Sequence, residues 1–104
     1  MTQDSIRLKN HILKKRNTIY TIMEKYGATN LRIFGSVANG TATKKSDIDL
    51  MVDLKNPPHS KLMTILGLEM EVREELGDEI DVVSSEKMLP KITSGIYHSE
   101  LISI

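Results

Sequence analysis

The first quarter of the chain alternates apolar and basic residues at helical spacing. Its apolar positions are Leu8, Ile12, Ile19, Ile22 or Met23, and Tyr26. Recurrence every three to four residues is typical of an amphipathic helix, which we expect over residues 5–26. Asp4 or Ser5 is placed to cap its start, and Gly27 suits the left-handed position just beyond its end.

A short strand and a short helix are expected next. The apolar run of residues 31–34 follows a turn at residues 28–30 and predicts a strand that ends at Gly35. One or two helical turns over residues 36–40 come directly after it, and residues 41–46 form a polar surface loop.

The second strand, expected over residues 47–53, has two chemically different faces. Side chains in a strand alternate between faces with a period of two. One face carries an apolar row made of Ile48, Leu50 and Val52. The other carries Asp47 and Asp49, whose negative charges repel each other, so a bound divalent cation is the obvious reason for the pair.

The second half of the chain continues the alternation. Proline cannot donate to a sheet ladder, so Pro57 and Pro58 end the second strand. A helix is expected over residues 60–76 with Gly77 as its C-cap, and a third strand over residues 79–83. The apolar stripe assigned to this helix is Leu62, Ile65, Leu66, Val72 and Leu76.

In the third strand Asp81 shares a face with Val83, opposite Ile80 and Val82. Beyond it, we expect a short helix that starts at residue 86 behind a Ser-Ser cap. Residues 100–104 alternate polar and apolar side chains, which favours a final edge strand over a helix. This order of elements predicts an α/β fold, a small mixed sheet flanked by helices, as one domain over residues 1–104.

Composition narrows the class of protein. The 14 basic and 14 acidic residues balance, which gives no global electrostatic case for nucleic acid or membrane binding. There is no cysteine, no run of transmembrane length and no signal-peptide core, so a cytoplasmic protein is the default expectation. The basic first helix and the acidic stretch of residues 69–81 are interpreted as solvated faces, with a docking surface as the alternative.

Three carboxylates form the candidate chemical centre. If the second and third strands are neighbours with their apolar faces on the helices, Asp47, Asp49 and Asp81 meet on one sheet face. Such a set would hold one or two Mg²⁺ ions and leave positions open for phosphates. A solvated strand-end residue is the simpler interpretation of Asp81 taken alone.

The Gly35-Ser36 pair could receive the phosphates. Glycine lets a triphosphate approach the backbone, and the following helix start offers free N–H groups. A Gly-Ser pair alone is a common turn. Its position just before the two acids is what makes it a candidate phosphate-binding element. Lys44 and Lys45 could reach outer phosphate oxygens, although a solvated loop is the simpler interpretation. No P-loop or dinucleotide-binding motif is present.

These segments resemble the signature of the DNA polymerase β-type nucleotidyltransferase superfamily. The matching segments are Gly35-Ser36, SDIDL at residues 46–50 and IDVV at residues 80–83. The short length and the N-terminal helix are most similar to the minimal nucleotidyltransferase (MNT) family. The resemblance implies a polymerase β-like fold with Mg²⁺ and ATP as ligands.

Within that resemblance, Asp47 and Asp49 would bind both metals of a two-metal site. Asp81 would complete the catalytic metal site and help to deprotonate the acceptor hydroxyl. Gly35 and Ser36 would hold the triphosphate, and we add Ser46 and Lys45 as neighbouring nucleotide-binding candidates. MNT proteins act as antitoxins of HEPN-domain toxins, and members transfer AMP to a toxin tyrosine.

One residue departs from the family pattern, which usually reads GSxARG. This chain has Asn39 at the position of the arginine. The loss of a charge-assisted phosphate contact could cost about 1.5–3 kcal/mol, unless Lys44 or Lys45 compensates. The departure bears on turnover more than on metal binding, because the three acids are present.

Three functions are therefore open. The first is an Mg²⁺-dependent adenylyltransferase that acts on a HEPN-domain toxin partner. The second is a stoichiometric antitoxin that blocks the toxin without catalysis. The third, nucleotide transfer to a small molecule such as an aminoglycoside, needs a substrate domain for which this length leaves no room. No membrane or direct nucleic acid partner is expected.

Overall fold

A four-stranded mixed sheet forms the centre of the computed structural model, which describes residues 1–55, 57, 59–85 and 102–104. The strands are β1 (Ala28–Phe34), β2 (Ile48–Leu54), β3 (Ile80–Ser84) and β4 (Ile102–Ser103), in the order β3-β2-β1-β4. Strand β1 runs antiparallel to β2 and β4, whereas β2 and β3 are parallel. The predicted fold class, a small mixed sheet flanked by helices, is confirmed.

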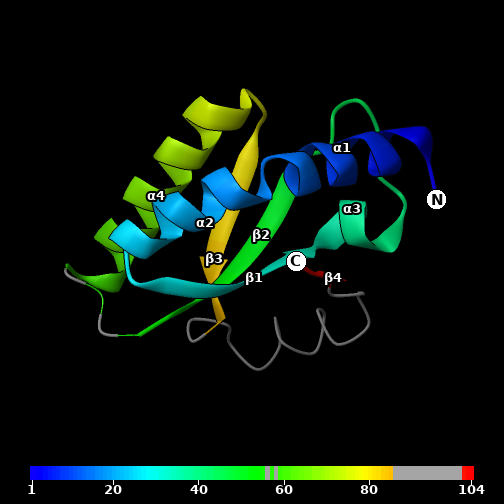
Figure 1. The fold of residues 1–104 in the computed structure, drawn as a ribbon. Coiled ribbons are helices and arrows are strands. Elements are labelled where there is room, and N and C mark those ends of the chain that lie inside the picture. The colour runs from blue at the N-terminus through cyan, green and yellow to red at the C-terminus, as the bar shows by residue number, and fades with distance from the viewer. Residues whose placement is uncertain (56, 58, 86–101) are drawn as a thin grey trace.

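The helices are α1 (Gln3–Lys14), α2 (Arg16–Lys25), α3 (Gly35–Asn39) and α4 (Lys61–Leu76). Helix α2 packs on β1 and on α4, and α4 packs on β3. Figure 1 shows α2 and α4 on the same side of the sheet, with α1 reaching past it to α3. In the described part of the chain, no helix is long and apolar enough to cross a membrane.

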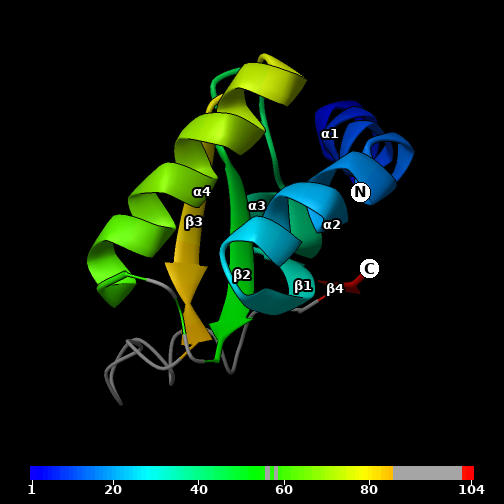
Figure 2. The same ribbon diagram turned by 60° about the vertical axis from the view of Figure 1, so that its left-hand side comes forward.

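The prediction of one continuous helix over residues 5–26 was wrong, because the chain breaks at Lys15. Lys15 has φ −96° and ψ 9°, and it separates α1 from α2, as Figure 2 shows. No residue between Ile12 and Ile19 belongs to the buried core, so apolar packing does not hold the two segments in line. Gly27 does take the left-handed conformation expected of it, at φ 67°.

The N-terminus of α1 is capped by Thr2 and not by Asp4 or Ser5 as predicted. The Thr2 hydroxyl accepts a hydrogen bond from the Ser5 amide at 3.1 Å. It also donates to the carbonyl of Ala42 at 2.7 Å, and the Ala42 amide donates to the Ser5 hydroxyl at 2.8 Å. The start of the chain therefore anchors the loop that leads to Asp47.

Residues 28–30 belong to β1 and not to a separate turn. Ala28 pairs with Leu54 and Thr29 with Asp53 before the register shifts ahead of Arg32. Asn30 lies in this irregularity at φ 56°, a conformation that asparagine tolerates better than most residues. The turn-like sequence therefore marks a bulge inside the strand.

Two other elements, α3 and β2, agree with the predicted ones to within one residue. Helix α3 starts at Gly35 and ends at the left-handed Gly40, with φ 78°. Strand β2 begins at Ile48, one residue later than predicted. The predicted final edge strand is confirmed by β4, which pairs with Arg32 and Ile33 of β1. The predicted short helix from residue 86 lies outside the described residues.

Helix α4 has the predicted ends, but its buried stripe differs from the predicted one. Ser60 caps its start and Gly77 its end, at φ 72°. The residues that face the core are Thr64, Ile65, Leu68, Val72 and Leu76. Leu62 and Leu66 are 57% and 46% exposed, so assigning them to the core was wrong. Leu66 follows Ile65 by about 100° around the helix, which turns it away from the sheet.

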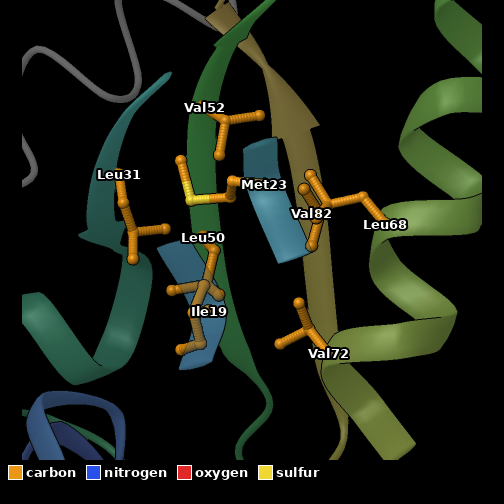
Figure 3. Close-up of a pocket in the computed structure, with 8 residues that line it drawn as sticks. All are labelled: Ile19, Met23, Leu31, Leu50, Val52, Leu68, Val72 and Val82. Atoms are coloured by element: carbon orange, nitrogen blue, oxygen red, sulfur yellow. The ribbon is translucent and has the colours of Figure 1, made fainter. Parts of the chain in front are cut away.

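The core lies between the sheet and the two helices that cover it. Figure 3 shows strand residues facing residues of α2 and α4: Leu31, Leu50, Val52 and Val82 against Ile19, Met23, Leu68 and Val72. These side chains leave no space for a water molecule. Tight packing means that removal of any of them leaves a cavity.

Two leucines of α4 give a matched test of this packing. Leu68 is 1% exposed and Leu66 is 46% exposed on the same helix. We expect Leu68→Ala to lower the free energy of unfolding by about 2–5 kcal/mol, and Leu66→Ala by less than about 1 kcal/mol. Chemical denaturation measures both values, and equal losses would contradict the observed orientation of α4.

Candidate active site

The parallel pairing of β2 with β3 places two of the predicted acids side by side. Ile48 pairs with Ile80, and Asp49 pairs with Asp81. The neighbouring residues Ile48 and Ile80 are fully buried, so Asp49 and Asp81 point to the other face of the sheet. The condition set in the sequence analysis, that the second and third strands are neighbours, is therefore met.

Asp49 lies in an unfavourable electrostatic environment. Its carboxyl is half-buried, and this burial, followed by the charges of Asp81 and Asp47, raises its pKa to about 6. Among the described residues, no hydrogen-bond donor or cation is paired with Asp49. The fold therefore holds an uncompensated negative charge at this position, which a cation would stabilise.

Asp53 lies on the same face of β2 four residues later and has the opposite environment. Hydrogen bonds from Ser85, Asn30 and Arg32 lower the pKa of its carboxyl, with the Ser85 bond as the largest cause. Arg32 also forms an ion pair with it. Asp53 is therefore neutralised within the fold, and Asp49 is not.

Asp47 precedes β2 and is exposed. Its charge reaches Asp49, as the raised pKa of Asp49 shows. The three acids are not drawn together into a finished metal site, because no group of three His, Asp or Glu side chains within the described residues is arranged to hold an ion. Carboxylate oxygens are nevertheless the ligands that Mg²⁺ prefers, so the donor set fits this ion.

Gly35 lies directly beside Asp49. It has φ 72°, and a Cβ added to it would lie 2.2 Å from Oδ2 of Asp49. Both the backbone conformation and the space exclude a side chain here. Ser36 follows in the first turn of α3 and is partly exposed. The structure thus places Gly35 against Asp49.

Ser46 and Lys45 lie in the loop before β2. The Ser46 hydroxyl accepts from the Thr43 amide at 2.8 Å, so it closes the loop on itself. Lys45 is exposed and, with Lys44 and Arg7, lines a cleft of about 320 Å³ that also contains Asp47. Sequence analysis missed Arg7, because α1 reaches this loop only in the folded chain.

Asn39 is the last residue of α3 and is exposed. Lys44 and Lys45, which could replace the arginine of the family pattern, lie in the loop that joins α3 to β2, on the wall of the cleft beside Asp47. Their positive charges are thus close to one of the three acids.

Comparison with known proteins identifies the class. The model of the family "Polymerase beta, Nucleotidyltransferase" matches residues 11–103. The chain belongs to this family and is an enzyme of the nucleotidyltransferase class. A candidate protein adenylyltransferase of Methanocaldococcus jannaschii is 32% identical over 87 residues, which are 84% of this chain and 88% of that protein. The protein adenylyltransferase MntA of Thermococcus cleftensis is 32% identical over 75 residues, covering 72% and 70%.

Solved structures agree with the fold. A candidate minimal nucleotidyltransferase matches all of this chain and 95% of its own, with a TM-score of 0.66 and 26% identity. A toxin–antitoxin complex that contains AMP-PNP matches 82% of this chain and 69% of its own, with a TM-score of 0.61 and 18% identity. Another neighbour is a mutant of the toxin–antitoxin pair MntA–HpeT, with a TM-score of 0.62, 16% identity, and 82% and 69% coverage. The expected membership of the minimal nucleotidyltransferases is confirmed.

The raised pKa of Asp49 predicts a pH dependence of stability. The folded state binds the Asp49 proton more tightly than the unfolded state does. The loss of stability caused by ionising Asp49 is therefore absent below about pH 4, grows up to pH 6 and is complete above it. We expect Asp49→Asn to stabilise the metal-free protein at pH 7 by about 1 kcal/mol, after allowance for solvent screening. Thermal unfolding of the wild type and of Asp49→Asn from pH 4 to pH 7 measures this. A stability difference between the two proteins that does not shrink on acidification would contradict the prediction.

The glycines at 35 and 77 give a second matched test. Both have φ 72°, but an added Cβ meets Asp49 only at Gly35 and nothing within 4 Å at Gly77. We expect both alanine variants to lose about 1–2 kcal/mol of stability through the left-handed backbone. Only Gly35→Ala should also weaken Mn²⁺ and ATP binding at least tenfold, because Asp49 must move away. Calorimetry of both variants tests this, and unchanged binding in Gly35→Ala would contradict it.

Proposed function

We propose that this protein is an Mg²⁺-dependent protein adenylyltransferase and the antitoxin of a HEPN-domain toxin, which it silences by transferring AMP from ATP to a tyrosine hydroxyl. The proposal rests on the environment of Asp49. Its carboxylate lies opposite Asp81, has no cationic partner among the described residues and has Gly35 directly against it. The names of the relatives support an adenylyl group and a protein acceptor.

In the proposed reaction, Asp47 and Asp49 would hold the metal ions and Asp81 would complete the set. The chemistry that bound Mg²⁺ supplies is polarisation of the phosphates and neutralisation of the pyrophosphate that leaves. Gly35 admits the triphosphate close to the backbone, and Ser36 offers a hydroxyl donor. Lys45 lines the cleft beside Asp47 and would contact an outer phosphate oxygen.

Group transfer then follows from these positions. The tyrosine oxygen attacks the α-phosphorus, a bond forms between them, and the bond from the α-phosphorus to the bridging oxygen of pyrophosphate breaks. The Asp81 carboxylate accepts the hydroxyl proton as general base. Pyrophosphate leaves with the electron pair.

The toxin–antitoxin structures support a protein partner. One of the neighbours contains AMP-PNP, an analogue of ATP, and another is named as an antitoxin with its toxin. The described part of this chain offers little surface for choosing an acceptor, so substrate selection would come from docking with a larger partner. The HEPN domain and the tyrosine come from the family resemblance.

The second candidate is a stoichiometric antitoxin that blocks its toxin by binding alone. Asn39 favours it, because a neutral residue replaces an arginine that could neutralise the triphosphate. This reading predicts protection of the cell without any transfer of AMP.

One experiment separates the two functions. The protein is incubated with ATP, Mg²⁺ and the product of the neighbouring gene as candidate toxin. Intact-mass spectrometry then measures the addition of AMP units to that toxin. We expect Asp47→Ala and Asp49→Ala to abolish both labelling and protection of cells from the toxin, with a loss of at least 100-fold in rate.

Arg16→Ala, on an exposed residue at the start of α2, is the control for charge removal and should label normally. Full protection by Asp49→Ala without labelling would establish the stoichiometric mechanism instead. Absence of labelling by the wild-type protein with a proven toxin partner would rule out the adenylyltransferase.

A further inference from the structure

The outer edge of β3 is held by two side chains of α4. Among the described residues, β3 is the last strand on its side of the sheet, so its backbone groups that point away from β2 have no described strand to pair with. The amide of Val82 donates to Oε2 of Glu69 at 3.1 Å. Nε of Arg73 donates to the carbonyl of Ile80 at 2.8 Å. These two bonds fix the backbone on either side of Asp81.

The two residues also bind each other. Glu69 and Arg73 lie one turn apart on α4, and Nη2 of Arg73 is 3.0 Å from Oε1 of Glu69. The Glu69 side chain is only 20% exposed. We call this pair the edge clamp. Its members share hydrogen bonds with the strand and with each other, so neither side chain can move without breaking two contacts.

Arg73 contacts the carboxylate of Asp81 as well. Nη2 lies 3.4 Å from Oδ1 of Asp81, and Nη1 lies 3.9 Å from Oε2 of Glu79. Asp81 therefore has a cationic neighbour, unlike Asp49. The fork of a guanidinium can satisfy a carbonyl and two carboxylates at once, which the single ammonium group of lysine cannot do.

We propose that the edge clamp positions Asp81 for the metal site and that Glu69 and Arg73 are positioning residues of the reaction. The inference rests on the proposed function, because it needs Asp81 as the third carboxylate. The clamp fixes the β3 backbone on either side of Asp81 and restricts the Asp81 carboxylate from turning toward solvent. Neither residue touches the reacting atoms.

This role follows from the exposure of Asp81. Its side chain is 49% exposed and lies on an edge strand, where a carboxylate is free to choose among rotamers. Asp49, on the central strand β2, is held by strands on both sides. A third carboxylate in a two-metal site must be placed to within a fraction of an ångström for full activity. The clamp supplies at β3 the restraint that neighbouring strands supply at β2.

The test compares Glu69→Ala and Arg73→Ala with two matched variants. Glu69→Gln keeps an acceptor for the Val82 amide and is the conservative rescue. Glu75→Ala removes an exposed acid from the same helix without touching β3, and it is the control for the charge of α4. All variants are full chains, and circular dichroism establishes that each is folded.

Three measurements are made on each variant. Amide hydrogen exchange at Val82 should accelerate at least tenfold in Glu69→Ala. Calorimetric titration with Mn²⁺ should show affinity five- to tenfold weaker in both alanine variants. The kcat for AMP transfer should fall at least tenfold while the KM for ATP stays within twofold. Glu69→Gln and Glu75→Ala should stay within twofold of the wild type in each measurement.

The outcomes distinguish two failures. If the wild type binds Mn²⁺ and transfers AMP but the alanine variants match Glu75→Ala, the clamp has no positioning role and only this inference is overturned. If the wild type neither binds Mn²⁺ nor transfers AMP, the proposed function fails and the inference falls with it.

If either alanine variant does not fold, Glu69→Gln and Arg73→Lys provide the test instead. The first should retain Mn²⁺ affinity and the second should lose it at least threefold, and the reverse order overturns the proposal.

Discussion

The parallel alignment of β2 with β3 is the constraint on which the candidate site depends. Ile48 and Ile80 pair on the buried face, which forces Asp49 and Asp81 together on the other. Burying an isoleucine contributes about 1.5–3 kcal/mol, and several such residues share this face. Repulsion between the acids costs less than that sum. Core burial therefore sets the register, and the concentrated negative charge follows from it.

Asp49 and Asp53 show that the surroundings of an aspartate, and not the residue type, decide whether it is a candidate metal ligand or part of a structural ion pair. Asp49 and Asp53 lie on the same face of β2, four residues apart. Asp53 receives hydrogen bonds from Asn30, Arg32 and Ser85, which lower its pKa. The neighbours of Asp49 are other acids, and its pKa is raised. The negative charge of Asp53, near the end of β2, is thus neutralised within the fold, whereas that of Asp49, near its start, is not.

Local patterns in the sequence were sufficient for β2, β3 and the glycines that follow the helices at Gly27 and Gly77, but not for the N-cap of α1 or the start of β1. Alternation with period two identified both β2 and β3, whereas their pairing was only a condition that the structure then met. The break at Lys15 was not predictable in the same way, because helical periodicity continues through it and only the different packing of α1 and α2 reveals it. The exposed side of Leu66 likewise depends on where the sheet lies relative to α4.

The contacts around Asp81 were beyond sequence analysis for a related reason. Glu69 and Arg73 have the i, i+4 spacing of an ordinary surface ion pair on a helix, and that signal was present in the sequence. Their bonds to the backbone of Val82 and Ile80 depend on how α4 lies along the edge of the sheet. The sequence also does not reveal how closely Asp49 approaches Gly35, because this approach depends on where the Asp49 side chain lies in the folded chain.

The covered edge of β3 has a consequence for the solubility of the protein. Unpaired amides and carbonyls along an edge strand are a template on which another chain can add a strand, the first step of aggregation. Side chains of α4 already occupy two of these groups. The same two residues that restrain Asp81 thus also block edge-to-edge association. Selection against edge-to-edge association and selection for a well-placed third carboxylate would therefore act on the same pair of positions.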